Sequence, residues 1–305
     1  MKILTVTLNP AFDVHCHADV FEARRENLAH ITDCDAGGKG VNVSRALASC
    51  GIGSTALVVV GEENGDAYLR AIKTDGVKCI SLTVPGRIRE NITIHTDGTT
   101  ETRLSFDGFE APDGLIGRVA QIVSRELSSG DVMTLCGRLP RGMDIAPVKD
   151  FLRSVASRGI MTVIDSGSFT LADLCEVRPY LIKPNEQETA AFTGHVPDDV
   201  GDALSCARGI HERGIENVMI SLGARGAVLC NSDGEFSADA PHVRAVSTIG
   251  AGDSAIAGFL AALASGKIGR ELLRGAVAYG SAACMTTGTK SPRRDDILKL
   301  LNEIK

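Results

Sequence analysis

Short apolar runs alternate along the chain with stretches of helical periodicity. The apolar runs are residues 3–8, 55–60, 132–136, 160–165, 180–184 and 217–222. Apolar residues at helical spacing follow or precede them at 41–50, 67–75 and 115–127. Runs that are apolar on both faces are typical of parallel strands covered by helices on each side. The pattern therefore predicts an α/β fold with a mostly parallel central sheet.

Two polar stretches interrupt this alternation. Residues 13–35 and 87–108 carry a pattern of period two, and the second contains Asp97-Gly98, a strong signal for a hairpin turn. These stretches predict antiparallel strands outside the main sheet. Because they are alike in character, we expect them to form one small sheet, a lid over the carboxyl edge of the main sheet. The expected organisation is a single domain, 1–305, that carries this lid.

Composition narrows the class of protein. The chain has 305 residues, of which 44% are hydrophobic, enough to bury one large core. No apolar run reaches 18 residues, and the N-terminal strand pattern meets a proline too early for a signal peptide, so a cytoplasmic protein is expected. The net charge is −6 and no long basic run occurs, which argues against nucleic acid or a membrane as partner. Nine scattered cysteines suit reduced thiols.

The segment DAGGKGVNVSRAL looks like a phosphate loop but lacks the hydroxyl residue that a Walker A loop has after its lysine. Asp13, in TLNPAFD, follows the first strand, at the edge where α/β sheets bind ligands. A carboxylate beside Gly37, Gly38 and Asn42 can bind the vicinal hydroxyls of a sugar. The alternatives are a tight turn that caps a helix and an aspartate that forms a turn.

Two further segments point to a nucleotide and its metal. LIKPNEQE ends a strand and places Asn185 and Glu188 on one face of a helix start, where their oxygens can hold a hydrated magnesium ion. The alternative is a capped, exposed helix start. SLGARGAV is a glycine turn between two strands, and glycine there lets a nucleotide lie against the backbone.

The segment STIGAGDSAIAGF predicts a glycine turn that opens a helix of small residues. Gly250, Ala251 and Gly252 can offer free N–H groups as an anion hole, and Asp253 can accept the proton of an attacking hydroxyl. Both functions are needed for phosphoryl transfer. The alternative is an aspartate that only complements the helix dipole.

AGGKGVN and STIGAGDSAIAGF are similar to the two signatures of the PfkB branch of the ribokinase-like kinases, and the resemblance extends over nearly the whole chain. It implies a three-layer αβα sandwich with a β lid, ATP as co-substrate, Mg²⁺ and Asp253 as catalytic base. It also implies that Asn185 and Glu188 match the magnesium motif, with the ion held through water. The residues implied at the ATP site are Lys183, Asn185, Ser221, Gly223 and Gly226.

The same resemblance assigns substrate contacts. Positions that match sugar-contacting residues are Asp13, Gly38, Lys39 and Asn42, and Gly37 joins this expected substrate site through its place beside Asp13. Arg89 matches an arginine that contacts the substrate phosphate, and Asn91 follows an Arg-x-Asn pattern found in kinases of fructose 1-phosphate. Arg138 is a departure, because the family reads Ser-Gly-Ser-Leu-Pro where this chain has CGRLP. An arginine there can add a bidentate grip on a phosphate, or it can mark a different substrate.

The sequence thus predicts an ATP-dependent kinase of a ketohexose phosphate, most similar to the kinases of fructose 1-phosphate. Tagatose 6-phosphate or another sugar is the alternative substrate, and a non-catalytic phosphosugar sensor is the alternative of another class. Lys39, Arg89 and Arg138 are expected to meet at the carboxyl edge and favour a phosphosugar over free fructose. An exposed lid has edges and an apolar face to cover, so a homodimer through the lid is expected.

Overall fold

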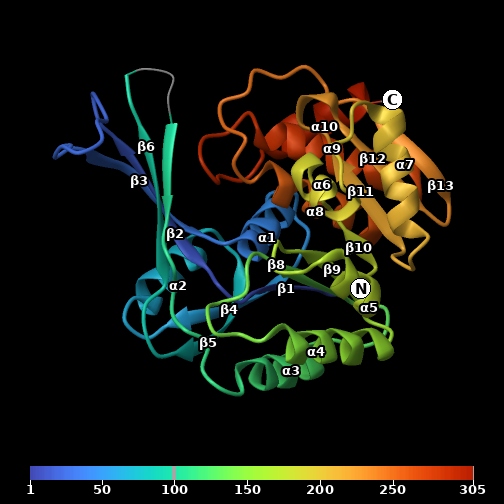
Figure 1. Cartoon of the computed structure of the whole chain (residues 1–305), viewed down its shortest axis with the longest axis horizontal. Coiled ribbons are helices and arrows are strands. Elements are labelled where there is room, and N and C mark those ends of the chain that lie inside the picture. The colour runs from blue at the N-terminus through green and yellow to red at the C-terminus, as the bar shows by residue number, and fades with distance from the viewer. Residues whose placement is uncertain (98–100, 305) are drawn as a thin grey trace.

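The computed structural model describes residues 1–97 and 101–304, and its centre is a nine-stranded sheet (Figure 1). The strand order is β13-β12-β11-β10-β9-β8-β1-β4-β5, in which β12 runs antiparallel to both of its neighbours and every other adjacent pair is parallel. The bounds are β1 Ile3–Thr7, β4 Thr55–Gly61, β5 Lys78–Val84, β8 Val132–Cys136, β9 Met161–Asp165, β10 Leu181–Ile182, β11 Asn217–Ser221, β12 Ala227–Asn231 and β13 Gly234–Ala238.

Helices cover both faces of this sheet. Strand β1 shows the reason, because Leu4 and Val6 join a core shared with α3, α4, α5 and α7, whereas Ile3 joins a second core shared with α1, α8, α9 and α10. The helices are α1 Lys39–Ser49, α2 Gly65–Thr74, α3 Leu115–Glu126, α4 Ile145–Ser157, α5 Leu171–Val177, α6 Glu186–Thr193, α7 Val200–His211, α8 Ala251–Ala264, α9 Arg270–Ala283 and α10 Arg294–Glu303. The predicted three-layer α/β class is confirmed.

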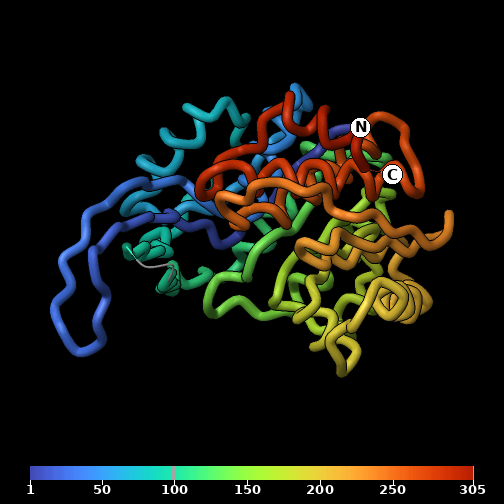
Figure 2. Tube along the Cα trace, turned by 90° about the horizontal axis from the view of Figure 1, so that it is seen from above, coloured from blue at the N-terminus to red at the C-terminus, as the bar shows by residue number. Residues whose placement is uncertain are grey.

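A second, four-stranded sheet stands beside the main body, with the order β3-β2-β6-β7. Its strands are β2 Ala11–His17, β3 His30–Gly37, β6 Arg89–His95 and β7 Glu101–Ser105. Figure 2 shows the blue segment that contains β2 and β3 extending beyond the rest of the molecule. We call this sheet the lid.

The lid consists of two antiparallel pairs, β2–β3 and β6–β7, joined by a parallel pairing of β2 with β6. A purely antiparallel lid was expected. The central pairing is parallel because β2 follows β1 and β6 follows β5, so both strands leave the same edge of the main sheet in the same direction. The predicted Asp97-Gly98 turn lies partly outside the described residues.

The lid contacts the main body through the segment that follows α9. The ammonium of Lys290 lies 3.0 Å from the carboxylate of Asp33, and the hydroxyl of Thr289 donates to Asp35 at 3.4 Å. These contacts hold the inner face of the lid near the start of α8, because Thr289 also lies beside Gly250. In the part of the chain that the structure describes, no helix has the length and apolar character needed to cross a membrane.

Candidate active site

Polar side chains gather at the carboxyl ends of neighbouring parallel strands. Arg138 follows β8, Asp165 is the last residue of β9, and Asn185 follows β10, while Asp13 lies on β2, the lid strand that comes after β1. The carboxyl ends of parallel strands lie at one edge of a sheet, and ligands of open α/β folds bind there. This edge, beside which the lid stands, is the candidate site.

Asp253 occupies the first turn of α8, where the chain packs against α1. Gly250 precedes the helix with φ of 77°, a left-handed conformation that favours glycine. The Asp253 side chain is buried, and its Oδ2 accepts a hydrogen bond of 2.9 Å from the side-chain amide of Asn42 on α1. The N-terminal end of α8 therefore presents a carboxylate beside the backbone N–H groups of its first turn, of which that of Ala251 donates to the Thr248 carbonyl at 3.4 Å.

An ion cluster lies beside Asp253, in which Asp165 and Lys183 are buried and Lys39 is partly exposed. Asp165 accepts a hydrogen bond of 2.9 Å from the Lys39 ammonium and lies 3.5 Å from that of Lys183. Gly252 contacts the same cluster, since a Cβ at that position would lie 3.1 Å from Lys183 Nζ. Two lysines and two aspartates thus neutralise one another around the start of α8.

The two aspartates differ in protonation. Burial, reinforced by the negative charge of Asp165, raises the pKa of Asp253 from 3.8 to about 7. Burial acts in the same direction on Asp165, but Lys183 and Lys39 outweigh it and lower the pKa of that carboxyl. Burial also disfavours the charge of Lys39, yet Asp165 and Asp253 raise its pKa. Asp165 therefore remains ionised, whereas Asp253 can exchange a proton near neutral pH.

A second group of residues lies on the inner face of the lid. The side-chain amide of Asn91 on β6 donates to Asp13 Oδ1 on β2 at 2.9 Å, across the parallel pairing of these strands. Gly37 lies directly against Asp13, because a Cβ there would come within 1.9 Å of its Oδ2. Burial raises the pKa of Asp13, which the Asn91 hydrogen bond and the charge of Arg103 oppose. Only glycine at position 37 leaves room for this carboxylate.

Two arginines, Arg89 and Arg138, lie near Asp13 and Asn91, and neither forms an ion pair with a carboxylate of the described residues. Arg89 is half-buried, and its Nε has no hydrogen-bond partner among the described residues. Burial lowers the pKa of Arg89 and the charge of Arg138 lowers it further, against the effect of Asp13. Arg138 is exposed and makes no hydrogen bond or ion pair within residues 1–97 and 101–304. The two arginines therefore lie close enough to repel one another, a repulsion that a bound anion would relieve.

The residues predicted to bind the nucleotide and the metal lie at the carboxyl edge of the main sheet on the side of β10 and β11. The Asn185 side chain accepts from the Glu188 N–H at 2.8 Å, and Glu188 accepts from the Asn185 N–H at 3.0 Å, so they form a reciprocal cap of α6. Glu188 also lines a cavity of about 130 Å³ together with Asp165 and Lys183. The capped helix start, which was the alternative to a metal site, is therefore present. Glu188 nevertheless shares a cavity with the carboxylate of Asp165.

The glycine turn predicted in SLGARGAV joins β11 to β12. Its residues form a short 3₁₀ turn, Gly223–Arg225, and Ser221 pairs with Asn185 through an isolated bridge. Gly226 adopts φ of 96°, and a Cβ there would lie 2.0 Å from the Ala238 carbonyl oxygen. The predicted ATP-site residues of β10 and β11 are therefore adjacent in space.

The structure thus places the residues that were expected to bind the phosphosugar in two groups rather than one. Asp13, Asn91, Arg89 and Arg138 lie toward the lid, whereas Lys39, expected among the arginines, is bound to Asp165 near Asp253. Sequence reasoning overlooked Asp165, although its position at the end of an apolar strand was a usable signal.

Arg103 was overlooked as well. It is paired with Thr93 across β6 and β7, which places it on the same face of the lid as Asn91. The alternation of the lid strands could have identified it once their register was known.

Comparisons with known proteins match this architecture. The model of the pfkB family carbohydrate kinases matches residues 10–296. The chain is 35% identical to the 1-phosphofructokinase of Haloferax volcanii, over 97% of this chain and 95% of that protein. It is 31% identical to the 1-phosphofructokinase of Escherichia coli (strain K12), over 92% and 90%.

A solved structure of phosphofructokinase-2 from Escherichia coli, in complex with substrates and products, superimposes with a TM-score of 0.93 at 26% identity, covering 99% of both chains. The family match spans nearly the whole chain and includes both candidate groups at the carboxyl edge. The chain therefore belongs to the pfkB family of carbohydrate kinases, which transfer a phosphoryl group to a sugar hydroxyl.

Proposed function

We propose that the chain transfers the γ-phosphoryl group of ATP to the free primary hydroxyl of fructose 1-phosphate and forms fructose 1,6-bisphosphate. The names of the two curated relatives support this substrate. The observation that carries the chemistry is the buried Asp253, whose pKa of about 7 lets it accept a proton at neutral pH.

Asp253 is the proposed catalytic base. It takes the proton of the attacking hydroxyl, while the N–H groups of Gly250, Ala251 and Gly252 stabilise the negative charge on the transferred group. Asn42 fixes the position of the carboxylate through its hydrogen bond of 2.9 Å. Lys39 and Lys183, already bound to Asp165, keep the local charge balanced as the phosphoryl group arrives.

The lid group is the proposed sugar site. Asp13 and Asn91 bind sugar hydroxyls, with Gly37 and Gly38 allowing the ring to approach the backbone. Arg89 and Arg138 bind the phosphate already present on the substrate. Two unpartnered buried atoms of the described chain, Arg89 Nε and Asn91 Oδ1, support this assignment, because buried polar atoms ordinarily find a partner.

The opposite end of the edge is the proposed nucleotide site. The glycine turn at Gly223 and Gly226 lets the nucleotide lie against the backbone, next to Ser221 and Asn185. Asp165 and Glu188 fit a hydrated Mg²⁺, since both carboxylates line one cavity and this ion takes few protein ligands. When bound, the ion neutralises phosphate charge in the transition state.

A substrate panel tests the proposal. ADP release is measured with fructose 1-phosphate, fructose 6-phosphate, tagatose 6-phosphate and fructose under one set of conditions. Fructose 1-phosphate is expected to give the highest kcat/KM. A higher value with tagatose 6-phosphate assigns the enzyme to that sugar instead, and no turnover with any phosphosugar indicates a binding protein.

We further propose that two chains associate through their lids in a cytoplasmic homodimer. Several large apolar side chains on or next to the lid strands are exposed, among them Leu28 before β3 at 86%, Ile31 on β3 at 68% and Phe106 after β7 at 50%. A second copy would cover them, because exposed apolar patches on a sheet mark association surfaces. Light scattering of the purified chain measures the mass that decides this point.

A further inference from the structure

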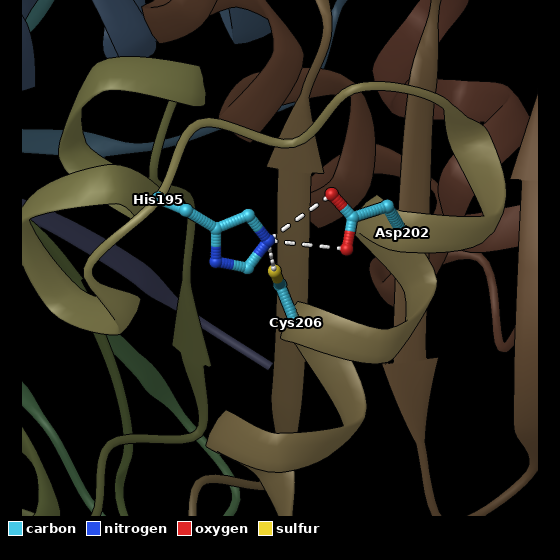
Figure 3. A group of neighbouring side chains, drawn as sticks. All are labelled: His195, Asp202 and Cys206. Carbon is cyan, nitrogen blue, oxygen red and sulfur yellow. Dashed lines mark hydrogen bonds and ion pairs between the residues drawn. The ribbon is translucent and has the colours of Figure 1, made fainter.

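Three different metal-ligating side chains meet beside α7, away from both groups described above. His195 lies in the connection between α6 and α7, and Asp202 and Cys206 project from successive turns of α7 (Figure 3). Asp202 and Cys206 are four residues apart and therefore share one face of the helix. All three candidate ligand atoms lie within 4.8 Å of one another.

The geometry of this group differs from that of a catalytic cysteine. His195 Nε2 lies 3.1 Å from each carboxylate oxygen of Asp202 and 3.8 Å from Cys206 Sγ. A cysteine nucleophile needs a histidine that binds the carboxylate through one ring nitrogen and the thiol through the other. Here the carboxylate and the thiol both face the same nitrogen, so the ring cannot relay a proton between them.

Convergence on one point is instead the arrangement that a metal ion requires. Tetrahedral zinc, with bonds of about 2.0–2.1 Å to nitrogen and about 2.3 Å to sulfur, holds these two atoms roughly 3.6 Å apart. The observed separation is 3.8 Å. The His195 side chain is 53% exposed and Cys206 is buried, so an ion can enter from solvent and keep a water as fourth ligand.

We infer that His195, Asp202 and Cys206 form a binding site for a zinc-class transition-metal ion. The ligand set of one imidazole, one carboxylate and one thiol suits Zn²⁺ and excludes Mg²⁺, which takes oxygen ligands. On binding, the Cys206 thiol releases its proton to solvent and coordinates as thiolate.

The site would tie down a segment that reaches the glycine turn after β11. The backbone N–H of Asp198 donates to Asp202 at 3.0 Å, and the carbonyl of Asp198 accepts from Arg225 in that turn at 2.7 Å. An ion on His195 and Asp202 therefore restrains both 195–206 and 223–226.

Cobalt titration tests the site directly, with no use of enzyme activity. The full chain, stripped with a chelator, is titrated with Co²⁺ and then Zn²⁺. We expect one Co²⁺ per chain, intense visible absorption of a tetrahedral ion, a thiolate-to-cobalt band in the near ultraviolet, and displacement of both signals by Zn²⁺. Cys206→Ser is expected to lose the thiolate band, whereas Cys175→Ser, which alters a cysteine of α5 outside the group, keeps it.

His195→Ala supplies a second variant that does not disturb the core, because this side chain is mostly exposed. We expect its apparent affinity for Zn²⁺ to fall at least about tenfold. Zn²⁺ is expected to slow hydrogen exchange in 195–206 and 223–226 of the native chain but not of this variant. Weak octahedral absorption without a thiolate band, or unchanged Zn²⁺ affinity in His195→Ala, would overturn the assignment.

A second cluster, His17, Asp19 and Asp97 at the lid, has no thiol and is largely exposed. Cobalt bound there produces no thiolate band, so that outcome counts against the α7 site. His17→Ala is the matched control, and the near-ultraviolet band of this variant is expected to equal that of the native chain.

Discussion

The side-chain NH₂ group of Asn42 donates a hydrogen bond of 2.9 Å to the carboxylate of Asp253, and the side-chain Oδ1 of Asn42 accepts one of 3.3 Å from Arg45. Arg45 is in turn bound to Asp75 at 2.7 Å. The Asn42 amide is therefore fixed from both sides, with its NH₂ group directed at Asp253. This relationship joins two motifs that are 211 residues apart and sets the orientation of the proposed base.

Asp253→Asn is expected to fold normally and to lose turnover by about 10²–10⁴-fold, because an amide cannot accept the proton of the attacking hydroxyl. The measurement is kcat with fructose 1-phosphate, alongside circular dichroism and ATP binding. Turnover close to that of the native chain would exclude Asp253 as the base.

The pKa of Asp253 predicts an acid limb in the rate profile. The carboxyl must be ionised to act as base, so kcat is expected to fall below pH 7, approaching tenfold per pH unit. Asp165 stays ionised over this range because its pKa is lowered. A flat profile between pH 5.5 and about 8 contradicts the proposed role.

The raised pKa of Asp253 also makes the free energy of unfolding depend on pH. Because the folded-state pKa is raised from 3.8 to about 7, the folded form holds the proton more tightly than the unfolded form between these values. The contribution of Asp253 to the free energy of unfolding is therefore present at low pH and is lost as the pH rises to about 7. Urea titrations are expected to show this loss for the native chain, whereas Asp253→Asn lacks this component.

Glu188→Gln separates a metal ligand from a helix cap. Glutamine preserves the capping box but removes the charge, so the free energy of unfolding is expected to change little while the Mg²⁺ concentration for half-maximal rate rises. Glu212→Gln is the control, since it removes equal charge from an exposed position after α7 whose side chain makes no ion pair among the described residues, whereas Glu186 is paired with Arg225 of the glycine turn. If the native chain and Glu188→Gln need the same Mg²⁺ concentration for half-maximal rate, Glu188 serves only to cap α6.

Arg89→Ala and Arg138→Ser are expected to reduce the preference for phosphosugars. Each charge-assisted hydrogen bond to a phosphate contributes about 1.5–3 kcal/mol, so each variant should lose roughly tenfold or more in kcat/KM with fructose 1-phosphate and little with fructose. Arg87→Ala is the control, because this neighbouring arginine is exposed and already paired with Glu90. Unchanged selectivity in both variants refutes the proposed phosphate pocket.

Arg45→Met tests the orientation of Asn42. Without the arginine the amide is free to turn, and kcat is expected to fall roughly three- to tenfold while KM for the sugar stays the same, the loss of about one hydrogen bond. Asp75→Asn leaves the Arg45 contact in place and should retain the native rate within about twofold. Equal losses in kcat and stability for the two variants would indicate a merely structural role.

The sequence predicted the three-layer sandwich, because few other folds bury both faces of apolar strands that alternate with helices. It also identified residues now found together, Asn42 with Asp253 and Asp13 with Asn91, although only the fold shows their contacts. The parallel pairing of β2 with β6 was not predicted, since an alternating pattern does not state strand direction.

The partners of Lys39 escaped prediction for a similar reason. Its position in a glycine loop suggests an anion, but its contact with Asp165 depends on the adjacency of the start of α1 and the end of β9, 126 residues apart. Local spacing carries no information about such a pair. The same holds for the α7 group, in which His195 lies outside the helix that bears its two neighbours.

The pairing of β2 with β6 also governs the order of folding. Asp13 and Asn91 are separated by 78 residues, so closing this contact costs far more chain entropy than forming a local hairpin. The segment between them contains β3, α1, β4, α2 and β5, so the two strands are not joined by a short turn. We expect the sugar pocket to be among the last parts of the chain to assemble, and refolding watched by substrate binding to lag behind refolding watched by helix content.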